Sequence, residues 1–143
     1  MQKEQQKFEI KNGVHHALSI NRKIELVCEG VNKNSISKHK NFDVALAIGI
    51  LHHLDDAIAE ELFETAYDAL NEGGIFLALD PVYTQNQSAA AKYIGGKNRG
   101  QAVRTDAAYI KLAKKHFRST QVLTDEQPLR IPYTGIFTIC SKQ

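Results

Sequence analysis

The 143-residue chain has few cysteines and no long apolar run, and each absence excludes a class of protein. Its two cysteines, Cys28 and Cys140, lie far apart and form no Cys-x-x-Cys spacing. We therefore expect buried, reduced thiols and no metal site, rather than a disulfide framework. No apolar segment approaches the roughly 20 residues that a membrane helix needs. The polar start, MQKEQQKFEIK, argues against a signal peptide. Together these absences predict a cytoplasmic protein without membrane association.

The composition is typical of a globular protein. Hydrophobic residues make up 43% of the chain and charged residues 24%, and a chain of this length buries roughly 70% of its unfolded surface. We expect a single domain over residues 1–143. Within it, residues 1–22 are weakly patterned and predict either a short helix or a flexible arm.

The net charge of +2 is unevenly distributed. Residues 54–80 carry acidic groups and no basic one, whereas residues 81–122 carry many basic groups and a single acidic one, Asp106. A basic segment can attract nucleic acid or a small anionic ligand. Few aromatic residues, among them Tyr93 and Tyr109, lie between the basic residues. We therefore favour a solvated helix face or a small anionic substrate over nucleic acid.

Residues 42–80, FDVALAIGILHHLDDAIAEELFETAYDALNEGGIFLALD, form the most informative segment. The runs Phe42–Ile50 and Ile75–Leu79 are apolar on both faces, which is typical of parallel strands covered by helices on each side. The segment between them predicts a helix, so the whole is a strand–helix–strand unit with a right-handed crossover. Ligands of such sheets bind at the carboxyl ends of the strands, here Ile48-Gly49 and Asp80.

The helix between the two strands has its own start and stop signals. Asp55 or Asp56 can cap its amino end, and Gly73-Gly74 predicts its end. Apolar residues at helical spacing predict its buried stripe: Ile58, Leu62, Ala66 and Leu70, with Ala59 and Phe63 beside them.

Shorter elements are predicted elsewhere. Thr105 can cap a helix that runs through Phe117. The other candidates are a strand over Ile24–Cys28, a short helix over Ser88–Ile94 that Gly95-Gly96 breaks, and two strands, Arg118–Leu123 and Gly135–Cys140, that close one sheet edge in an antiparallel manner.

This arrangement resembles the second half of a class I S-adenosylmethionine-dependent methyltransferase. The resemblance rests on Phe-Asp-Val at 42–44, Leu-His-His-Leu at 51–54 and Leu-x-x-Gly-Gly at 70–74. The segments RGQAVRT (99–105) and LRIPYTGIF (129–137) look like the remaining part of the domain in one bacterial branch of that family. The resemblance implies an α/β fold with a truncated Rossmann-like sheet, which is mostly parallel and has an antiparallel carboxyl-terminal strand.

The family's cofactor signature is missing from the sequence. The family carries Gly-x-Gly-x-Gly on its first strand-to-helix turn, where the backbone approaches the ligand closely. None of the nine glycines of this chain forms that pattern. The family's first strands are missing too, which leaves strand Phe42–Ile50 without a neighbour. An unpaired strand edge invites pairing, so we expect Ile24–Cys28, a second copy or another polypeptide to complete the sheet.

The resemblance implies candidate site residues. S-adenosylmethionine would contact Ala47, Ile48 and Gly49 at the strand end, His53 on the loop and the backbone at Val31, where Gly30 replaces an aspartate that commonly binds adenine. Histidine titrates near neutral pH, so either His52 or His53 can face this cleft. The adjacent pair lacks a third ligand at useful spacing, which argues against a metal. The substrate candidates are Asp80, Arg99 and Arg104, each of which can also serve a structural role.

Three functional hypotheses follow. The first is methyl transfer from S-adenosylmethionine to a small-molecule acceptor, a reaction that requires alignment and needs a base only for some acceptors; no catalytic residue stands out. The second is a non-catalytic, degenerate half-domain that acts as a binding or regulatory subunit. The third is that the sequence is a truncated reading of a longer methyltransferase.

Overall fold

A computed structural model describes residues 30–143 except 32, 38, 86, 98–101 and 127–132. The described helices are α2 (Lys33–Ile36), α3 (Asp56–Ala69), α4 (Ala89–Lys97) and α5 (Asp106–Ala113), with a 3₁₀ turn at Leu51–His53. The strands are β1 (Phe42–Ile48), β2 (Leu70–Tyr83), β3 (Arg104–Thr105), β4 (Ser119–Asp125) and β5 (Gly135–Ser141). The predicted strand Ile24–Cys28 and the predicted arm at residues 1–22 lie outside the described residues.

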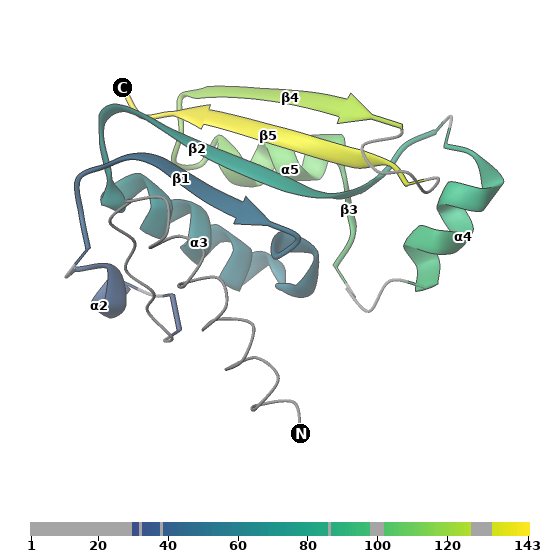
Figure 1. Ribbon diagram of the computed structural model, residues 1–143, viewed down its shortest axis with the longest axis horizontal. Helices are drawn as coiled ribbons and strands as arrows, with labels where there is room; N and C mark the ends of the chain where they lie inside the picture. Colours follow the sequence, from purple (N-terminus) through teal and green to yellow (C-terminus); the bar gives the residue numbers. More distant parts are fainter. Residues whose placement is uncertain (1–29, 32, 38, 86, 98–101, 127–132) are drawn as a thin grey trace, which may run out of the picture. The chain divides into compact units, whose positions relative to one another are not determined.

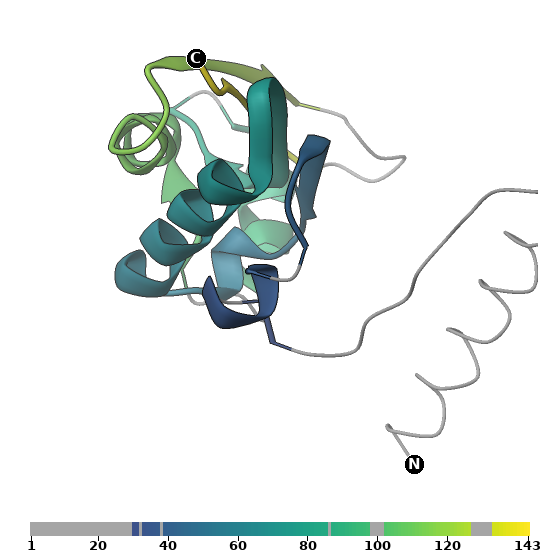
Figure 2. The ribbon, with the colours of Figure 1, turned by 90° about the vertical axis from the view of Figure 1, so that its left-hand side faces the viewer.

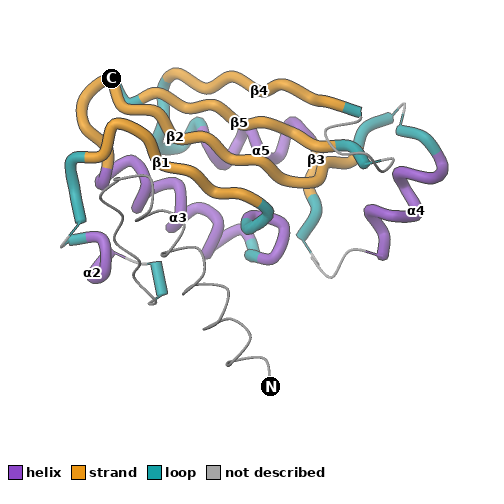
Figure 3. Tube along the Cα trace, viewed as in Figure 1, coloured by secondary structure: helices purple, strands orange, loops and turns teal. Residues whose placement is uncertain are grey.

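The strands form one sheet in the order β1-β2-β5-β4, and the short β3 pairs with the end of β2 (Figures 1 and 3). The pairs β1–β2 and β2–β3 are parallel, whereas β2–β5 and β4–β5 are antiparallel. The predicted α/β class and the antiparallel strands at the carboxyl-terminal end are confirmed. Strand β2 lies inside the sheet, because it pairs with β1 on one side and with β5 on the other.

The β1–α3–β2 unit forms as predicted, with shifted boundaries. The Asp55 side chain caps α3 by accepting a hydrogen bond from the Ile58 N–H (2.9 Å). The helix ends at Ala69, before the two glycines, because Leu70 already pairs with Phe42 of β1. Gly73 then adopts a positive φ of 78°, and a side chain at Gly74 would collide with the backbone oxygens of Asn71 and Phe42. The glycines therefore shape the start of β2 instead of ending the helix.

Helices α3 and α5 cover one face of the sheet (Figure 2). The core between them is aromatic: Phe63 meets Phe76 edge-on at a ring distance of 5.3 Å, and Phe76 stacks on Phe117 at 6.1 Å. The buried stripe of α3 contains Ala59 and Phe63, whereas Ile58 is exposed. The predicted stripe was therefore centred slightly off the helix face that packs.

Strand β1 differs from the prediction of a strand covered on both faces. Ala47 is buried beneath α3, but the alternate side chains of Val44, Leu46 and Ile48 are exposed. Within the described residues β1 pairs with β2 alone. Among the described strands it is therefore an edge strand with one open face.

Two further helix predictions need correction. Helix α4 continues through Gly95 and Gly96 to Lys97 instead of breaking there, and it lies beyond the end of the sheet (Figure 1). Thr105 does cap α5, since its side-chain oxygen accepts from the Ala108 N–H. Helix α5 ends at Ala113, however, and Phe117 lies just after the turn that follows the helix, where it is fully buried. None of the described helices is long and apolar enough to cross a membrane.

Candidate functional site

The carboxyl ends of β1 and β2 lie side by side, and polar residues follow both. Ile48 is in register with Leu79, so the next residues along the two strands, Gly49 and Asp80, lie at one edge of the sheet. The Gly49 N–H donates to the Leu79 carbonyl at 2.8 Å. Gly49 has a φ of +65°, in the left-handed region that favours glycine. This turn directs the chain from β1 into the 3₁₀ turn.

The 3₁₀ turn places His52 within hydrogen-bonding distance of Asp80. The His52 N–H donates to Asp80 Oδ1 at 3.1 Å, and its Nδ1 lies 2.8 Å from the same oxygen. Both residues are buried. An ionised Asp80 accepts a proton-bearing Nδ1, which leaves Nε2 of a neutral His52 without the proton and therefore basic. The pair has the chemistry of an oriented general base.

The environment of Asp80 opposes its ionisation. Burial raises the pKa of this carboxyl, and the hydrogen bonds from His52 lower it by less. Its second oxygen, Oδ2, is buried and has no hydrogen-bond partner among the residues that the structure describes. Burial also raises the pKa of Tyr109, with Asp80 as the second cause, while the Tyr109 hydroxyl donates to the Pro81 carbonyl at 3.0 Å. Asp80 is thus a carboxyl with an unused acceptor in a low-dielectric surrounding.

Arg104 holds the turn that carries His52. Its guanidinium donates to the carbonyls of Leu51 and Leu54, each at 2.7 Å, and to that of Ala102 at 3.1 Å. Its Nε donates to Asp56 at 2.8 Å. The Ala102 N–H also donates to the His52 carbonyl at 3.0 Å. Residues 102–104 therefore fasten the 3₁₀ turn through its backbone.

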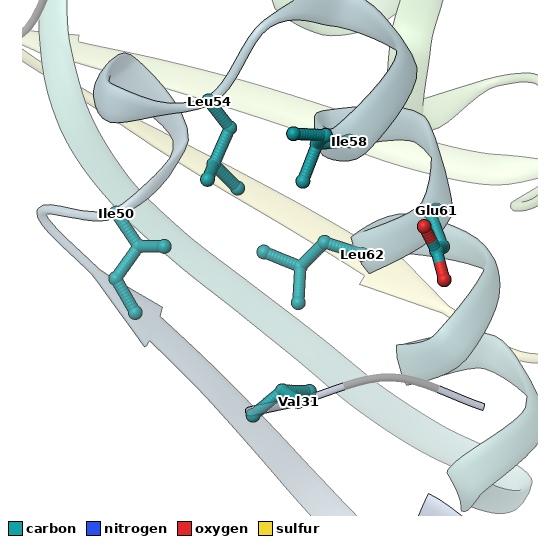
Figure 4. Close-up of a pocket in the computed structure, with 6 residues that line it drawn as sticks. All are labelled: Val31, Ile50, Leu54, Ile58, Glu61 and Leu62. Carbon is teal, nitrogen blue, oxygen red and sulfur yellow. The ribbon is translucent and has the colours of Figure 1, made fainter. Parts of the chain in front are cut away.

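Two adjoining cavities lie beside β1 and α3. The first has a volume of about 190 Å³, and Figure 4 shows its lining: Val31, Ile50, Leu54, Ile58, Glu61 and Leu62. All of these are apolar except Glu61. The second has a volume of about 260 Å³ and runs along β1, where Val31, Val44, Leu46 and Ala47 contribute to its wall. Both are smaller than the about 300–1,000 Å³ of a typical small-molecule pocket.

No family model matches the chain, and no curated protein sequence matches it. Solved structures do. An O-methyltransferase family protein from Burkholderia thailandensis is 13% identical with a TM-score of 0.63, and the match covers 94% of this chain and 41% of that one. Mitomycin 7-O-methyltransferase MmcR is 18% identical with a TM-score of 0.55, covering 72% and 30%. Human N-acetylserotonin methyltransferase, solved with S-adenosylmethionine, is 18% identical with a TM-score of 0.55, covering 70% and 29%.

The chain has a methyltransferase-like fold. It spans less than half the length of each of these proteins. At these identities the likeness establishes the fold and leaves cofactor, substrate and reaction to be argued from the residues.

The methyltransferase-like fold brings some of the predicted cofactor residues together. Val31 and Ala47 line the same cavity. Gly49 lies at the turn beside His52, whose Cε1 would be 3.9 Å from a Cβ at position 49. The side chains of Ile48 and His53 are exposed and line neither cavity. Their contact with a cofactor stays a prediction.

The predicted substrate residues have different surroundings. Asp80 lies at the functional edge, as predicted, bonded to His52. Arg104 directs its donors at protein groups, which gives it a structural role; a contact with substrate remains a prediction. Arg99 lies outside the described residues. No group of three metal-ligating side chains occurs within the part of the chain that the structure describes.

His52 is the site residue that the sequence could not single out. Adjacent histidines point in different directions, and nothing in the spacing indicates which one bonds to a carboxylate 28 positions away. The rings of His52 and His53 lie 4.0 Å apart, but only His52 contacts Asp80 among the hydrogen bonds of this turn. The one signal available was the position of Asp80 at the end of an apolar strand, which predicted that this aspartate would lie at the functional edge.

Proposed function

We propose that the chain is a methyltransferase domain that uses S-adenosylmethionine to methylate a hydroxyl group of a small-molecule acceptor. The observation that carries the proposal is the buried Asp80–His52 pair at the carboxyl edge of β1 and β2. Similar folds belong to O-methyltransferases, one of which is named for N-acetylserotonin and one for mitomycin. A hydroxyl acceptor must lose its proton, and the pair offers a group that can take it.

The cavity beside α3 fits part of the cofactor. Its apolar walls suit the flat adenine ring, and the Glu61 carboxylate can accept a hydrogen bond from an exocyclic amino group. At about 190 Å³ it holds a portion of the cofactor rather than all of it. Val31, Ile50 and Leu54 would contact the ring there. When bound, S-adenosylmethionine supplies a methyl group already activated by its sulfonium sulfur.

The role of the protein in this proposal is alignment and proton removal. Asp80 orients His52 through Nδ1, and Arg104 holds the turn, so that Nε2 keeps one direction. A positioned base of this kind contributes about 10²–10⁴-fold to the rate. Because His52 and Asp80 are both buried, their position helps to exclude water from the pair.

Calorimetric titration with S-adenosylmethionine and S-adenosylhomocysteine tests cofactor binding. We expect saturable binding with a dissociation constant in the micromolar range, and Leu54→Asp, which places a charge on the apolar wall, should weaken it at least tenfold. A sample that is folded by circular dichroism and binds neither compound would overturn the proposal.

The matched variants His52→Gln and His53→Gln then test the base. With an acceptor found by screening for S-adenosylhomocysteine release, His52→Gln should lower turnover by about 10²–10⁴-fold and leave cofactor affinity unchanged. His53 makes none of the hydrogen bonds that join this turn to Asp80, so His53→Gln should keep turnover at saturating cofactor within a few-fold. Equal losses in both variants would contradict the assignment of the base to His52.

A second function is favoured by the absence of Gly-x-Gly-x-Gly from the sequence. Without that loop the domain could serve as a non-catalytic binding or regulatory subunit. The titration separates the two proposals, because a folded chain that binds no cofactor supports only the second.

A further inference from the structure

The outer edge of β1 has backbone groups that no described strand uses. The Gly49 N–H points to β2, where it donates to the Leu79 carbonyl. Because successive residues of a strand point their backbone groups to opposite sides, those of Ala45 and Ala47 also face β2. The N–H and C=O groups of the alternate residues Val44, Leu46 and Ile48 therefore face outward.

The side chains at this edge are apolar and exposed. Val44 is 56% exposed, Leu46 60% and Ile48 63%. The stretch Val44–Ile48 contains no charge, proline or glycine, which are the residues that usually guard a strand edge against pairing. The charge that precedes it, on Asp43, is held by the Asn71 amide at 2.9 Å.

The opposite edge of the sheet is different. Strand β4 carries Gln121, Thr124 and Asp125, so polar groups and a charge interrupt its surface. Leu123 is its one highly exposed apolar residue, at 59%. Of the two edges that the described strands form, β1 therefore has fewer polar groups to oppose pairing.

We propose that β1 pairs with β1 of a second copy of this chain, antiparallel and about a two-fold axis at Leu46. A two-fold interface must be complementary to itself, and β1 meets that condition. With Leu46 opposite Leu46 of the other copy, Val44 lies opposite Ile48, and each of these pairs exchanges two N–H···O bonds. All three outward-facing residues then gain backbone partners, and their side chains become cross-strand neighbours.

The exposed apolar side chains of β1 supply part of a dimer interface. They belong to Phe42, Val44, Leu46 and Ile48. Together they expose on the order of 400 Å² per copy, which is within the about 300–600 Å² of the largest apolar patch on a monomer. A standard interface buries about 800 Å² on each partner, so these side chains account for about half of one.

Light scattering on the intact chain, with two matched leucine variants, tests the pairing. We expect a dimer for the wild type. Leu46→Lys places like charges face to face at the axis and should raise the dissociation constant at least about 100-fold. Leu123→Lys is the control, because Leu123 is equally exposed on the opposite edge; it should leave the dimer intact. A monomeric wild type, or a Leu46→Lys protein that remains dimeric, overturns the proposal.

Cross-linking tests the register independently of folding defects. Residues opposite each other in an antiparallel pair have Cβ atoms about 4.5–5.5 Å apart, close to the span of a disulfide. In a Cys28→Ser background, Leu46→Cys should form a covalent dimer on mild oxidation, whereas Leu123→Cys should not. Absence of the cross-link in a sample with native circular dichroism, or equal cross-linking of both variants, would refute the pairing. Neither result depends on cofactor binding, so this proposal can fail or hold separately from the proposed function.

Discussion

Replacing Arg104 with methionine should destabilise the protein by removing the donors that hold the 3₁₀ turn. Methionine keeps an apolar stem of similar reach, so the change tests the hydrogen bonds more than the packing. The Arg104 side chain is 7% exposed, and its two shortest bonds to backbone groups, both 2.7 Å, go to the carbonyls of Leu51 and Leu54. Without it, those carbonyls lose charged donors in a largely buried place.

The magnitude follows from these contacts. A hydrogen bond from a charged donor contributes about 1.5–3 kcal/mol, so the two carbonyl bonds together predict a loss of about 3–6 kcal/mol. The bond to Asp56 adds little, because the Asp56 side chain is 82% exposed and a surface pair contributes about 0–1 kcal/mol. A loss of this size is a large part of the about 5–15 kcal/mol that stabilises a typical domain.

Urea unfolding followed by far-ultraviolet circular dichroism measures the loss, and the signal suits a chain that has no tryptophan. Asp56→Asn is the control and should change the free energy of unfolding by less than about 1 kcal/mol. Both proteins must be compared with wild type at one concentration, since association shifts apparent stability. A loss below about 1 kcal/mol for Arg104→Met would refute the reasoning.

Three further predictions address the site edge and the core. Burial raises the pKa of Asp80, so ionising this carboxyl costs more free energy in the folded chain than in the unfolded one. Its contribution to stability is therefore greatest below about pH 3.9 and falls as pH rises through the higher folded-state pKa. Asp80→Asn removes the ionisation, so its melting temperature relative to wild type should be higher at pH 7 than at pH 3.5, and a pH-independent difference would contradict this. Gly49→Ala should cost about 1–2 kcal/mol in urea because of the positive φ alone, and Gly73→Ala should cost a similar amount although its surroundings are open. Phe63→Ala should cost about 3–5 kcal/mol by cavity formation, whereas Tyr93→Ala, which is mostly exposed, should change unfolding by less than about 0.5 kcal/mol; similar losses in the two would argue against the described core.

Elements with strong periodicity could be predicted from the sequence. The apolar runs at Phe42–Ile50 and Ile75–Leu79 and the helical spacing between them all correspond to described elements. Boundaries were less predictable. Helix α3 ends at Ala69 because pairing with β1 begins at Leu70, and that pairing joins residues far apart in the chain. Helix α4 passes through Gly95 and Gly96, where the local preference of glycine predicted a break.

The candidate site was predictable in part. The position of Asp80 at a functional edge followed from the strand–helix–strand pattern. The choice between His52 and His53 did not, because it depends on how the 3₁₀ turn lies against a strand 28 residues later. The contacts of Arg104 were also beyond the sequence, since three of its acceptors are backbone carbonyls, which have no signature in the residue types.

Local periodicity and composition were enough to predict the alternation of strand and helix, the place of Asp80 at the end of a strand and the lack of a glycine-rich loop. The histidine that bonds to Asp80, the groups that Arg104 binds and the sheet edge that has no partner among the described strands became known only from the tertiary structure. Those outcomes depend on long-range pairing of β1 with β2 and of β2 with β5, and the pairing energy is shared among residues that no local pattern connects.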